Sequence, residues 1–510
     1  MLQALSLLIP ALLLAPTLAK TPEEWSSRSI YQLITDRFAT TNGTATPCDS
    51  SKREYCGGTW KGIEDHLDYI QYMGFDAIWI SPITANIEGN FSAGEAYHGY
   101  WSQNLDEINH HFGTEQDLKD LGAAVHKRDM YLMVDVVVNH MAATALPPKF
   151  NFDGFFHPFT DQSYFHPQCF INSTETDQHL IEQCWFGNPE MPLPDLNTEN
   201  STVVDLLNSW IHNLVQEFDV DGLRIDTVKH IRKDFWPEWV QSAGVYTLGE
   251  VVYNDSETAA PWTEVVDAIL DYPTYFKLSE TFSGPVPGKF PDLVTMMERS
   301  QANYKHGLFQ TGSFIENHDQ PRVAGLTQDA ALIRNAMTFS FIHDGIPIAL
   351  WFSAYEQEKP IVQHFRTLNA ARKAAIASTS SFLTTPFMSV HDESVAILKP
   401  PMLALLTNIG SQEGKSATWE VPGAYAPNEM LVDVLTCSHM MANAQGDVVV
   451  PSDYGMPQVL MPASKLPRGG SLCPDMATGE RAVSGASKMG IKPAYMVAGV
   501  VASLMWRTVL

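Results

Sequence analysis

Residues 131–140 have the sequence YLMVDVVVNH. From Tyr131 to Val138 the residues are almost all apolar or β-branched, which is typical of a strand buried on both faces in a parallel sheet. Polar Asn139 and His140 follow at the end of the run, where a strand would meet a loop. The stretch therefore predicts a strand of a parallel α/β fold, with polar side chains at its carboxyl end.

Similar short runs recur between about residues 29 and 375, and helical stretches separate them. Together they predict a closed (β/α)8 TIM barrel, an α/β fold. An open, doubly wound sheet is the alternative, but no G-x-G-x-x-G sequence follows the first strand. The other predicted strands are Ile30–Ile34, Ala77–Ile80, Gly222–Ile225, Tyr246–Leu248, Ala268–Leu270, Ser313–Ile315 and Ile346–Leu350.

Two segments do not follow the alternation of strands and helices. Residues 141–200 are rich in Pro, Phe, Asn and Asp, and a structureless loop of that length is improbable, so we predict a small inserted domain after the third strand. Residues 379–476 contain short strand-like runs separated by Gly, Pro and Asn, which predict a C-terminal β-sandwich domain. The barrel would then comprise residues 20–140 and 201–378.

Both ends of the chain have the composition of processing signals. Residues 1–19 form an apolar run that ends in small residues, as in a secretory signal peptide; a short core helix is the alternative. Residues 477–510 combine a linker, a small-residue stretch, a polar spacer and a terminal apolar tail, which predict a glycosylphosphatidylinositol (GPI) anchor attached at Ser484. The tail is too short to span a bilayer. We therefore expect a secreted protein that is tethered by lipid at the outer face of the cell membrane, or in the cell wall.

The composition excludes some classes of partner. The 510 residues include 32 Lys and Arg against 58 Asp and Glu, so the formal net charge is −26. An acidic surface repels nucleic-acid phosphates and anionic lipid headgroups. Hydrophobic residues make up 45% of the chain, as in a globular protein. Neutral ligands such as sugars are not excluded, and because no pattern predicts an oligomer, we expect a monomer.

The six cysteines fall into three couples that are close in sequence. Six cysteines allow 15 connectivities, of which nearest-neighbour disulfides are expected in an oxidising compartment. A zinc site is the alternative, although no C-x-x-C spacing occurs. Five N-x-S/T sequons agree with secretion. The expected disulfides are Cys48–Cys56, Cys169–Cys184 and Cys437–Cys473, and the candidate glycosylation sites are Asn42, Asn90, Asn172, Asn200 and Asn254.

Polar or charged residues occur where four predicted strands end, which is the catalytic face of a TIM barrel, and Asn139 and His140 form one of these ends. Arg224 and Asp226 are two residues apart, so both project to the same side of one strand. Glu250 and Asp319 lie at the ends of two others. A lone Asp there is usually a helix cap, whereas converging carboxyl groups suit glycoside hydrolysis, in which one protonates the leaving oxygen and one meets the anomeric carbon. A magnesium site is the alternative use of the same residue types.

The order of the motifs along the chain resembles that of a known family. DVVVNH, LPDL, GLRIDTVKH, GEV and ENHD begin at residues 135, 193, 222, 249 and 316. This series resembles the α-amylase family of glycoside hydrolases, over about residues 22–475. The runs YCGGTW (55–60) and AYHGYW (96–101) resemble the secreted fungal α-amylases in particular. The anchor-like tail is similar to that of lipid-anchored fungal enzymes that transfer glucan chains in the cell wall.

The resemblance implies a role for each matching residue. Asp226 would be the nucleophile, Glu250 the general acid/base and Asp319 a third carboxylate that stabilises the transition state. Arg224 would orient the nucleophile and keep it ionised. Each predicted histidine could instead be a buried residue with satisfied hydrogen bonds. The implied sugar contacts are Tyr100, with Trp101 packed beside it, His140 and His318, and on the leaving-group side Lys229 and His230.

The same resemblance implies a structural calcium ion between the barrel and the inserted domain. The positions that match its ligands are Asn139, Glu182, Asp195 and the backbone carbonyl of His230. Hard oxygen donors from separate segments suit Ca²⁺. The ion would fasten the segment that carries Lys229 to the insert, so it would be required for folding and activity without taking part in the reaction.

The chain departs from the fungal amylases after the last predicted strand. Those proteins continue with a glycine-rich, acidic loop that lines the substrate cleft, whereas residues 351–358 here lead quickly into a helix near 363–375. The relatives also carry a further disulfide in the second half of the barrel, where this chain has no cysteine. We therefore consider three functions: a retaining α-1,4-glucan endo-hydrolase, a 4-α-glucanotransferase that remodels cell-wall α-glucan, and a non-catalytic glucan-binding wall protein. The intact carboxylates argue against the third.

Overall fold

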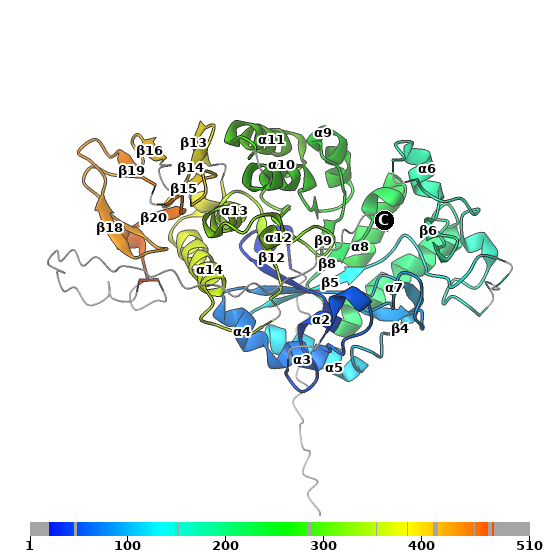
Figure 1. Cartoon of the computed structure of the whole chain (residues 1–510). Helices are drawn as coiled ribbons and strands as arrows, with labels where there is room; N and C mark the ends of the chain where they lie inside the picture. Colours follow the sequence, from blue (N-terminus) through cyan, green and yellow to red (C-terminus); the bar gives the residue numbers. More distant parts are fainter. Residues whose placement is uncertain are drawn as a thin grey trace, which may run out of the picture.

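Eight parallel strands form the centre of the computed structural model (Figure 1), which describes residues 20–467 and 472–473 except 45–47, 148, 150, 151, 153, 173, 284–286, 353, 385, 412–416 and 453. Their hydrogen-bonded order is β10-β9-β8-β5-β2-β1-β12-β11, and a parallel bridge between Leu270 and Gly312 closes the sheet. The predicted TIM barrel is thereby confirmed. The strands are β1 (Ile30–Leu33), β2 (Ala77–Ile80), β5 (Tyr131–Val136), β8 (Gly222–Ile225), β9 (Tyr246–Gly249), β10 (Ala268–Ile269), β11 (Gly312–Ser313) and β12 (Ile346–Leu350).

The strands agree with the predicted ones except at their ends. β5 ends at Val136, two residues earlier than predicted, and β11 contains only Gly312 and Ser313. A Cβ atom at Gly312 would lie 2.7 Å from Leu270 Cδ2 and 2.9 Å from Ile348 Cδ1. Glycine therefore lets this short strand approach its neighbours where the barrel closes.

Helices cover the outside of the barrel (Figure 1). In α7 the Asn200 side chain caps the first turn by accepting from the Thr202 N–H, and the chain leaves the helix at Asp219 in the left-handed conformation (φ 50°). Its apolar residues recur at helical spacing and face the core. The helices are α1 (Pro22–Ser26), α2 (Thr35–Phe38), α3 (Trp60–Asp65), α4 (Leu67–Tyr72), α5 (Glu115–His126), α7 (Ser201–Phe218), α8 (Trp236–Ala243), α9 (Ser256–Ala259), α10 (Tyr272–Phe282), α11 (Phe290–Asn303), α12 (Val323–Leu326), α13 (Ala330–Ile342) and α14 (Pro360–Ser378).

The segment between β5 and α7 contains little regular structure. It includes α6 (Gln178–Gln183) and a hairpin of β6 (Phe186–Asn188) and β7 (Met191–Leu193). Phe159 and Phe165 are buried in the core that the segment shares with the barrel. The segment lies beside a second hairpin, β3 (Thr84–Asn86) with β4 (Ser102–Ile108), through a bridge between Asn104 and His157. In Figure 1 it occupies the end of the molecule opposite the C-terminal strands.

The C-terminal region forms two antiparallel sheets, as predicted. Apolar residues of the larger sheet pack against Trp419 and Val450 of the smaller one, which gives this region a core of its own. It joins the barrel through a buried ion pair between Lys399 and Asp344. The larger sheet contains β13 (Phe387–His391), β14 (Ser394–Lys399), β15 (Met402–Thr407), β20 (Gln458–Pro462), β17 (Met430–Asp433) and β18 (Ser438–Met441); the smaller contains β16 (Thr418–Val421) and β19 (Val448–Pro451).

All three expected disulfides are formed, namely Cys48–Cys56, Cys169–Cys184 and Cys437–Cys473. Of the candidate glycosylation sites, Asn200 is half-buried and its Nδ2 lies 3.4 Å from the Ser163 carbonyl oxygen, whereas the other four are exposed. Glycosylation itself stays a prediction. The predicted signal peptide (1–19) and the linker and anchor segment (477–510, with Ser484) lie outside the described residues. Within the described residues, no helix has the length and hydrophobicity to cross a bilayer.

Candidate active site

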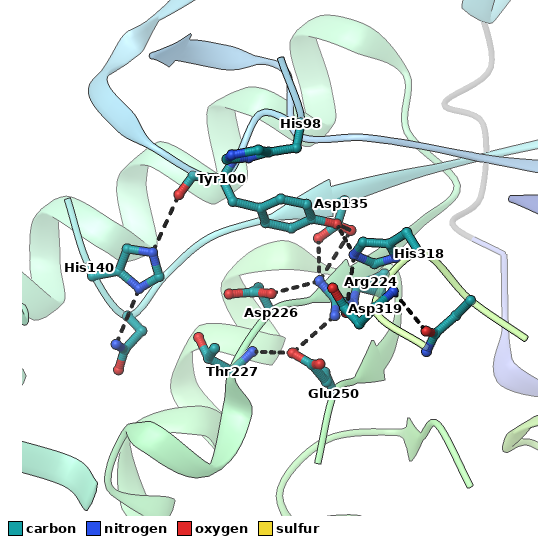
Figure 2. Close-up of polar contacts among 12 residues, drawn as sticks. His98, Tyr100, Asp135, His140, Arg224, Asp226, Thr227, Glu250, His318 and Asp319 are labelled. Carbon is teal, nitrogen blue, oxygen red and sulfur yellow. Dashed lines mark hydrogen bonds and ion pairs between the residues drawn. The ribbon is translucent and has the colours of Figure 1, made fainter. Parts of the chain in front are cut away.

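The carboxyl ends of neighbouring barrel strands bring the predicted catalytic residues together (Figure 2). In the parallel register, Ile225 of β8 is paired with Gly249 of β9. Asp226 and Glu250 directly follow these two strands, so their side chains extend from adjacent strand ends. Asp319 comes from the loop that follows β11. The site therefore depends on strand register as much as on residue type.

Arg224 is fully buried and holds three carboxyl groups. Its Nη1 donates to Asp135 Oδ1 at 2.9 Å and to Asp226 Oδ1 at 2.8 Å. Its Nη2 lies 3.0 Å from Glu250 Oε2, which also accepts from the Thr227 N–H at 3.1 Å. Because none of its surface is exposed, Arg224 orients the carboxyl groups and does not itself line the sugar cavity described below.

The crowded carboxyl groups do not all ionise together. Burial raises the pKa of Asp226 well above its ordinary value, against the opposing Arg224 charge, and the nearby Glu250 adds to the rise. Burial and Glu250 raise the pKa of Asp319 to about 7. Burial also disfavours ionised Glu250, but the Arg224 guanidinium and the Thr227 N–H outweigh it and lower its pKa. The directions of these shifts therefore favour the neutral form at Asp226 and the ionised form at Glu250 in the free protein.

Tyr100 and His318 form a stacked pair beside these carboxyl groups. Their rings are parallel within 2°, with centroids 5.3 Å apart. The Tyr100 hydroxyl donates to Asp135 Oδ2 at 2.6 Å and lies 2.8 Å from His318 Nε2 (Figure 2). Burial and the Arg224 charge lower the pKa of His318 to about 4. This histidine is therefore neutral at neutral pH and can exchange hydrogen bonds with a sugar hydroxyl.

His140 and Trp101 lie on the other side of Tyr100. The His140 Nε2–H donates to the Tyr100 carbonyl oxygen at 3.3 Å, and burial lowers the pKa of His140 to about 4. Trp101 is buried, its backbone N–H donates to Asn86 Oδ1 at 2.7 Å, and its ring packs edge-on against His98 with centroids 4.7 Å apart. Trp101 is thus packed against His98, and it also lines the cavity described below.

A cavity of about 350 Å³ opens above these groups, a size within the range of small-ligand sites. Lys229 and His230 lie outside its lining, on the 3₁₀ helix Val228–His230. The Lys229 ammonium donates to the Val252 carbonyl at 3.0 Å, and the His230 ring packs 4.4 Å from the Phe186 ring. The predicted residues that line the cavity are Tyr100, Trp101, His140, Asp226, His318 and Asp319.

Several residues of the site had no predicted role. Asp135 is a buried partner of Arg224 and Tyr100, and its position as the lone acid within an apolar strand was a usable signal. His98 and Trp351 line the cavity. His98 belongs to the quoted AYHGYW run, whereas Trp351 carried no local signal because it directly follows a barrel strand in a segment without a motif.

The predicted calcium ligands fit an ion only in part. Asn139 Oδ1 and Asp195 Oδ1 are buried oxygens without a hydrogen-bond partner, which is the donor chemistry that Ca²⁺ prefers. The N–H of residue 196 donates to the Asn139 carbonyl at 2.9 Å, so the two segments are adjacent. Glu182, however, accepts from Gln178 at 2.6 Å, and the same amide donates to the Lys229 carbonyl.

No group of three or more Asp, Glu, His or Cys side chains is arranged for a metal within the described residues. The other Asp195 oxygen, Oδ2, lies 2.6 Å from His166 Nδ1. The calcium site thus stays a prediction, supported by the two unpartnered oxygens of Asn139 and Asp195.

Comparisons with known proteins cover both parts of the chain. A family model described as "Alpha amylase, catalytic domain" matches residues 32–351, and one described as "Alpha-amylase, domain C" matches residues 389–480. Alpha-amylase mde5 of Schizosaccharomyces pombe is 39% identical over 477 residues, which cover 88% of this chain and 90% of that protein. An alpha-amylase of Saccharomycopsis fibuligera is 38% identical over 463 residues, covering 86% and 92%.

A solved structure gives the same result. That of an alpha-amylase from Malbranchea cinnamomea superimposes with a TM-score of 0.85 at 38% identity, and the match covers 89% of this chain and 100% of that one. The similarity therefore extends over the barrel, the insert and the C-terminal sheets.

Proposed function

Because the chain belongs to the α-amylase family of glycoside hydrolases, we propose that it is a retaining α-1,4-glucan endo-hydrolase that cuts starch-like or cell-wall α-glucan. One observation carries the proposal: Asp226 and Glu250 each contact a terminal nitrogen of the same guanidinium, Arg224. Retaining enzymes hold their two carboxyl groups about 5 Å apart, whereas inverting enzymes leave room for a water molecule between them. Two carboxyl groups on one guanidinium fit the shorter separation.

The neutral histidines and Tyr100 provide the sugar contacts in this proposal. A glucose ring lies against the aromatic face of Tyr100, while His140 and His318 exchange hydrogen bonds with its hydroxyls. Both imidazoles are neutral at neutral pH because burial lowers their pKa to about 4. They therefore add no positive charge that would repel the cationic character of the sugar in the transition state.

The reaction begins with a proton shift between the paired carboxyl groups. The proton held by Asp226 passes to Glu250, which leaves Asp226 as a carboxylate against Arg224. Glu250 then protonates the glycosidic oxygen while Asp226 attacks the anomeric carbon, so the C–O bond breaks and a covalent ester forms. Glu250 next takes a proton from water, whose oxygen attacks the same carbon and releases Asp226. Asp319 stabilises both cationic transition states.

Calcium and the lipid anchor complete the proposal. Asn139, Glu182, Asp195 and the His230 carbonyl would hold a structural Ca²⁺, which fastens the insert to the segment after Asp226 and contributes no chemical step. The protein is secreted and held at the cell surface or in the wall by its lipid anchor. There it would meet soluble starch-like glucans or the α-glucan of the wall.

A second candidate is a 4-α-glucanotransferase, in which a sugar hydroxyl takes the place of water. The specific observation in its favour is the short connection between β12 and α14, residues 351–359, where fungal amylases carry a longer cleft-lining loop. A shorter loop leaves the substrate cleft more open on the side of the nucleophile. The preferred length of the glucan chain and the choice of acceptor would both change as a result. The covalent intermediate is common to both reactions.

Product analysis separates the candidates. The purified protein is incubated with maltoheptaose, and new reducing ends, chain lengths and the anomer formed first are recorded, with Asp226→Asn as the inactive control. Rising reducing ends with the α-anomer formed first support the hydrolase. Redistributed lengths at constant reducing ends support the transferase. A β-anomer contradicts the retaining mechanism, and no change in any product, with binding retained, indicates a glucan-binding protein.

A further inference from the structure

Gln32 is a buried amide on β1, 1% exposed, and none of the motifs above includes it. Its Nε2 lies 2.7 Å from Nδ1 of His318. The other ring nitrogen, His318 Nε2, lies 2.8 Å from the Tyr100 hydroxyl and 3.3 Å from Asp319 Oδ2. Each nitrogen of this cavity-lining ring therefore has its own partner, and the positions of the hydrogens decide what the ring offers a sugar.

The single hydroxyl hydrogen of Tyr100 is already committed. Asp135 Oδ2, 2.6 Å away, also faces the N–H groups of Trp79 at 3.1 Å and of Arg224 at 3.2 Å. Because two other N–H groups already donate to Asp135 Oδ2, this oxygen carries no proton and acts as an acceptor. Tyr100 must therefore donate to Asp135, which leaves only a lone pair of its oxygen for His318.

The position of the hydrogen on the His318 ring follows from this assignment of donors and acceptors. Nε2 must carry the hydrogen, because both of its neighbours, the Tyr100 oxygen and the Asp319 carboxyl group, can accept it. A neutral imidazole then has a lone pair on Nδ1, which can only accept from the Gln32 amide N–H. The reverse amide orientation would place Oε1 against Nδ1 and require the hydrogen there, so that Tyr100 would have to serve both Nε2 and Asp135 with one hydrogen.

We propose that Gln32 is a positioning residue that fixes His318 as the neutral tautomer with its hydrogen on Nε2, the nitrogen nearest Asp319. The proposal rests on the proposed function and deepens it. Asp226 and Asp319 are acceptors when ionised, so a sugar hydroxyl between them can donate to a carboxylate and needs a donor for its own oxygen. His318 Nε2–H supplies that donor only while Gln32 occupies Nδ1.

The amide also opposes protonation of His318. An imidazolium would carry a second hydrogen on Nδ1, directly opposite the Gln32 N–H, and the two donors would repel each other. Arg224 acts in the same direction, while the negative charges of Asp135 and Glu250 oppose it; burial together with these charges lowers the pKa of His318 to about 4. Gln32 Oε1 has no hydrogen-bond partner, so within the described residues the contact with His318 is what orients this amide.

Nitrogen NMR of the substrate-free protein tests the tautomer directly. The full chain is labelled with ¹⁵N-histidine, and the His318 signals are assigned by their loss in His318→Asn. At pH 8, above the raised pKa of Asp319 (about 7), that carboxylate can only accept, and we expect a protonated Nε2 and an unprotonated Nδ1. A hydrogen on Nδ1, alone or with one on Nε2, overturns the inference. The measurement needs no turnover, so its failure is distinct from a failure of the proposed hydrolase function.

Two variants then test whether Gln32 is responsible. Gln32→Met keeps the length of the side chain without a donor; we expect both tautomers in the spectrum and a fall of about tenfold in kcat/KM for maltoheptaose, the scale of one lost hydrogen bond. Gln32→Glu provides an acceptor and should move the hydrogen to Nδ1, or protonate the ring near neutral pH.

The matched control is Gln310→Met, which removes another buried glutamine, one whose Nε2 bonds to Glu23 at 3.2 Å. It should leave the His318 spectrum and kcat/KM unchanged. A folded Gln32→Met protein with the wild-type spectrum or wild-type kcat/KM contradicts the proposal. If that variant does not fold, Gln32→Glu tests the role of Gln32, and a wild-type His318 spectrum in Gln32→Glu contradicts the proposal.

Discussion

Arg224 donates from Nη1 to Asp226 Oδ1 at 2.8 Å inside the barrel, and the arginine has no exposed surface. Both residues belong to one short segment of the chain, two positions apart, so the nucleophile and the group that orients it are positioned by the same strand end. The contact opposes the pKa rise that burial causes at Asp226. The same guanidinium contacts Glu250 through its other terminal nitrogen, so Arg224 holds the two carboxyl groups close together.

Replacing Asp226 with asparagine should abolish turnover without unfolding the protein. The amide keeps the shape of the side chain and can still accept from Arg224, but it cannot form the covalent ester. We expect kcat on soluble starch to fall by at least about 10³-fold, with a melting temperature close to that of the wild type. Residual kcat within tenfold of the wild type would remove Asp226 from its role as nucleophile.

Glu250→Gln should be rescued by a substrate whose leaving group needs no proton. We expect this variant to lose activity on maltoheptaose but to release fluoride from α-maltotriosyl fluoride in a single-turnover burst, because fluoride leaves without a proton whereas hydrolysis of the covalent intermediate still needs Glu250 as the base. Asp226→Asn is the matched control and should release no fluoride. Equal losses of Glu250→Gln activity on both substrates would contradict its assignment as the acid.

The pH profile of kcat/KM should be bell-shaped. Asp319, whose raised pKa is about 7, becomes a carboxylate as the pH rises through that value, so its stabilisation of the cationic transition states should increase. The Asp226–Glu250 pair must hold one proton for the acid step, and burial raises the pKa of Asp226 well above its ordinary value, so the activity should decline once the pH passes that raised pKa. At the acid end, His140 and His318, with pKa values lowered to about 4, become charged below that pH and activity should fall again. Circular dichroism at each pH shows whether a loss of activity reflects unfolding of the protein instead. A kcat/KM that shows no decline at high pH while the protein stays folded would contradict the alkaline limb.

The ion pair between Lys399 of β14 and Asp344 should stabilise the contact between the barrel and the C-terminal sheets strongly. The side chains are 1% and 2% exposed, and Nζ lies 2.5 Å from Oδ1. Lys399→Met leaves Asp344 buried and unpaired, which should cost about 3–5 kcal/mol in the free energy of unfolding. The double variant Lys399→Met/Asp344→Asn should recover part of the loss, because it removes the unpaired charge as well.

Lys289→Met is the control for that pair. Lys289 and Asp392 also join the barrel to the C-terminal sheets, at 2.8 Å, but both side chains are exposed. Solvent screens such a pair, so the melting temperature should not change measurably. Thermal unfolding with equal shifts for the buried and the exposed pair would show that burial is not what makes the Lys399 pair important.

Chelation should lower the melting temperature if Asn139 and Asp195 hold calcium. Their unpartnered buried oxygens would then lose the ion that compensates their burial. Asp195→Asn weakens the same site, so it should melt earlier than the wild type and respond less to EDTA. A wild-type melting curve that EDTA leaves unchanged, and that added calcium leaves unchanged, would contradict the site.

The barrel was predictable because its strands are buried on both faces. That environment selects continuous apolar runs such as the one from Tyr131 to Val136, which stand out without any knowledge of neighbours. β11 was predicted less accurately because it has two residues, and its position depends on how closely Gly312 approaches other strands. The carboxyl groups of Asp226 and Glu250 were found because a charge at the end of an apolar strand is unusual locally.

The sequence by itself determined the fold class, the disulfide partners and the residue types at each strand end, because these follow from composition and spacing along a few residues. Only the tertiary structure decided which of those residues share one guanidinium, which line the cavity and which lie outside it, as Lys229 and His230 do. The bond between Gln32 and His318 joins residues 286 positions apart. Such a contact leaves no local pattern, since barrel closure, and not the neighbouring sequence, brings the two side chains together.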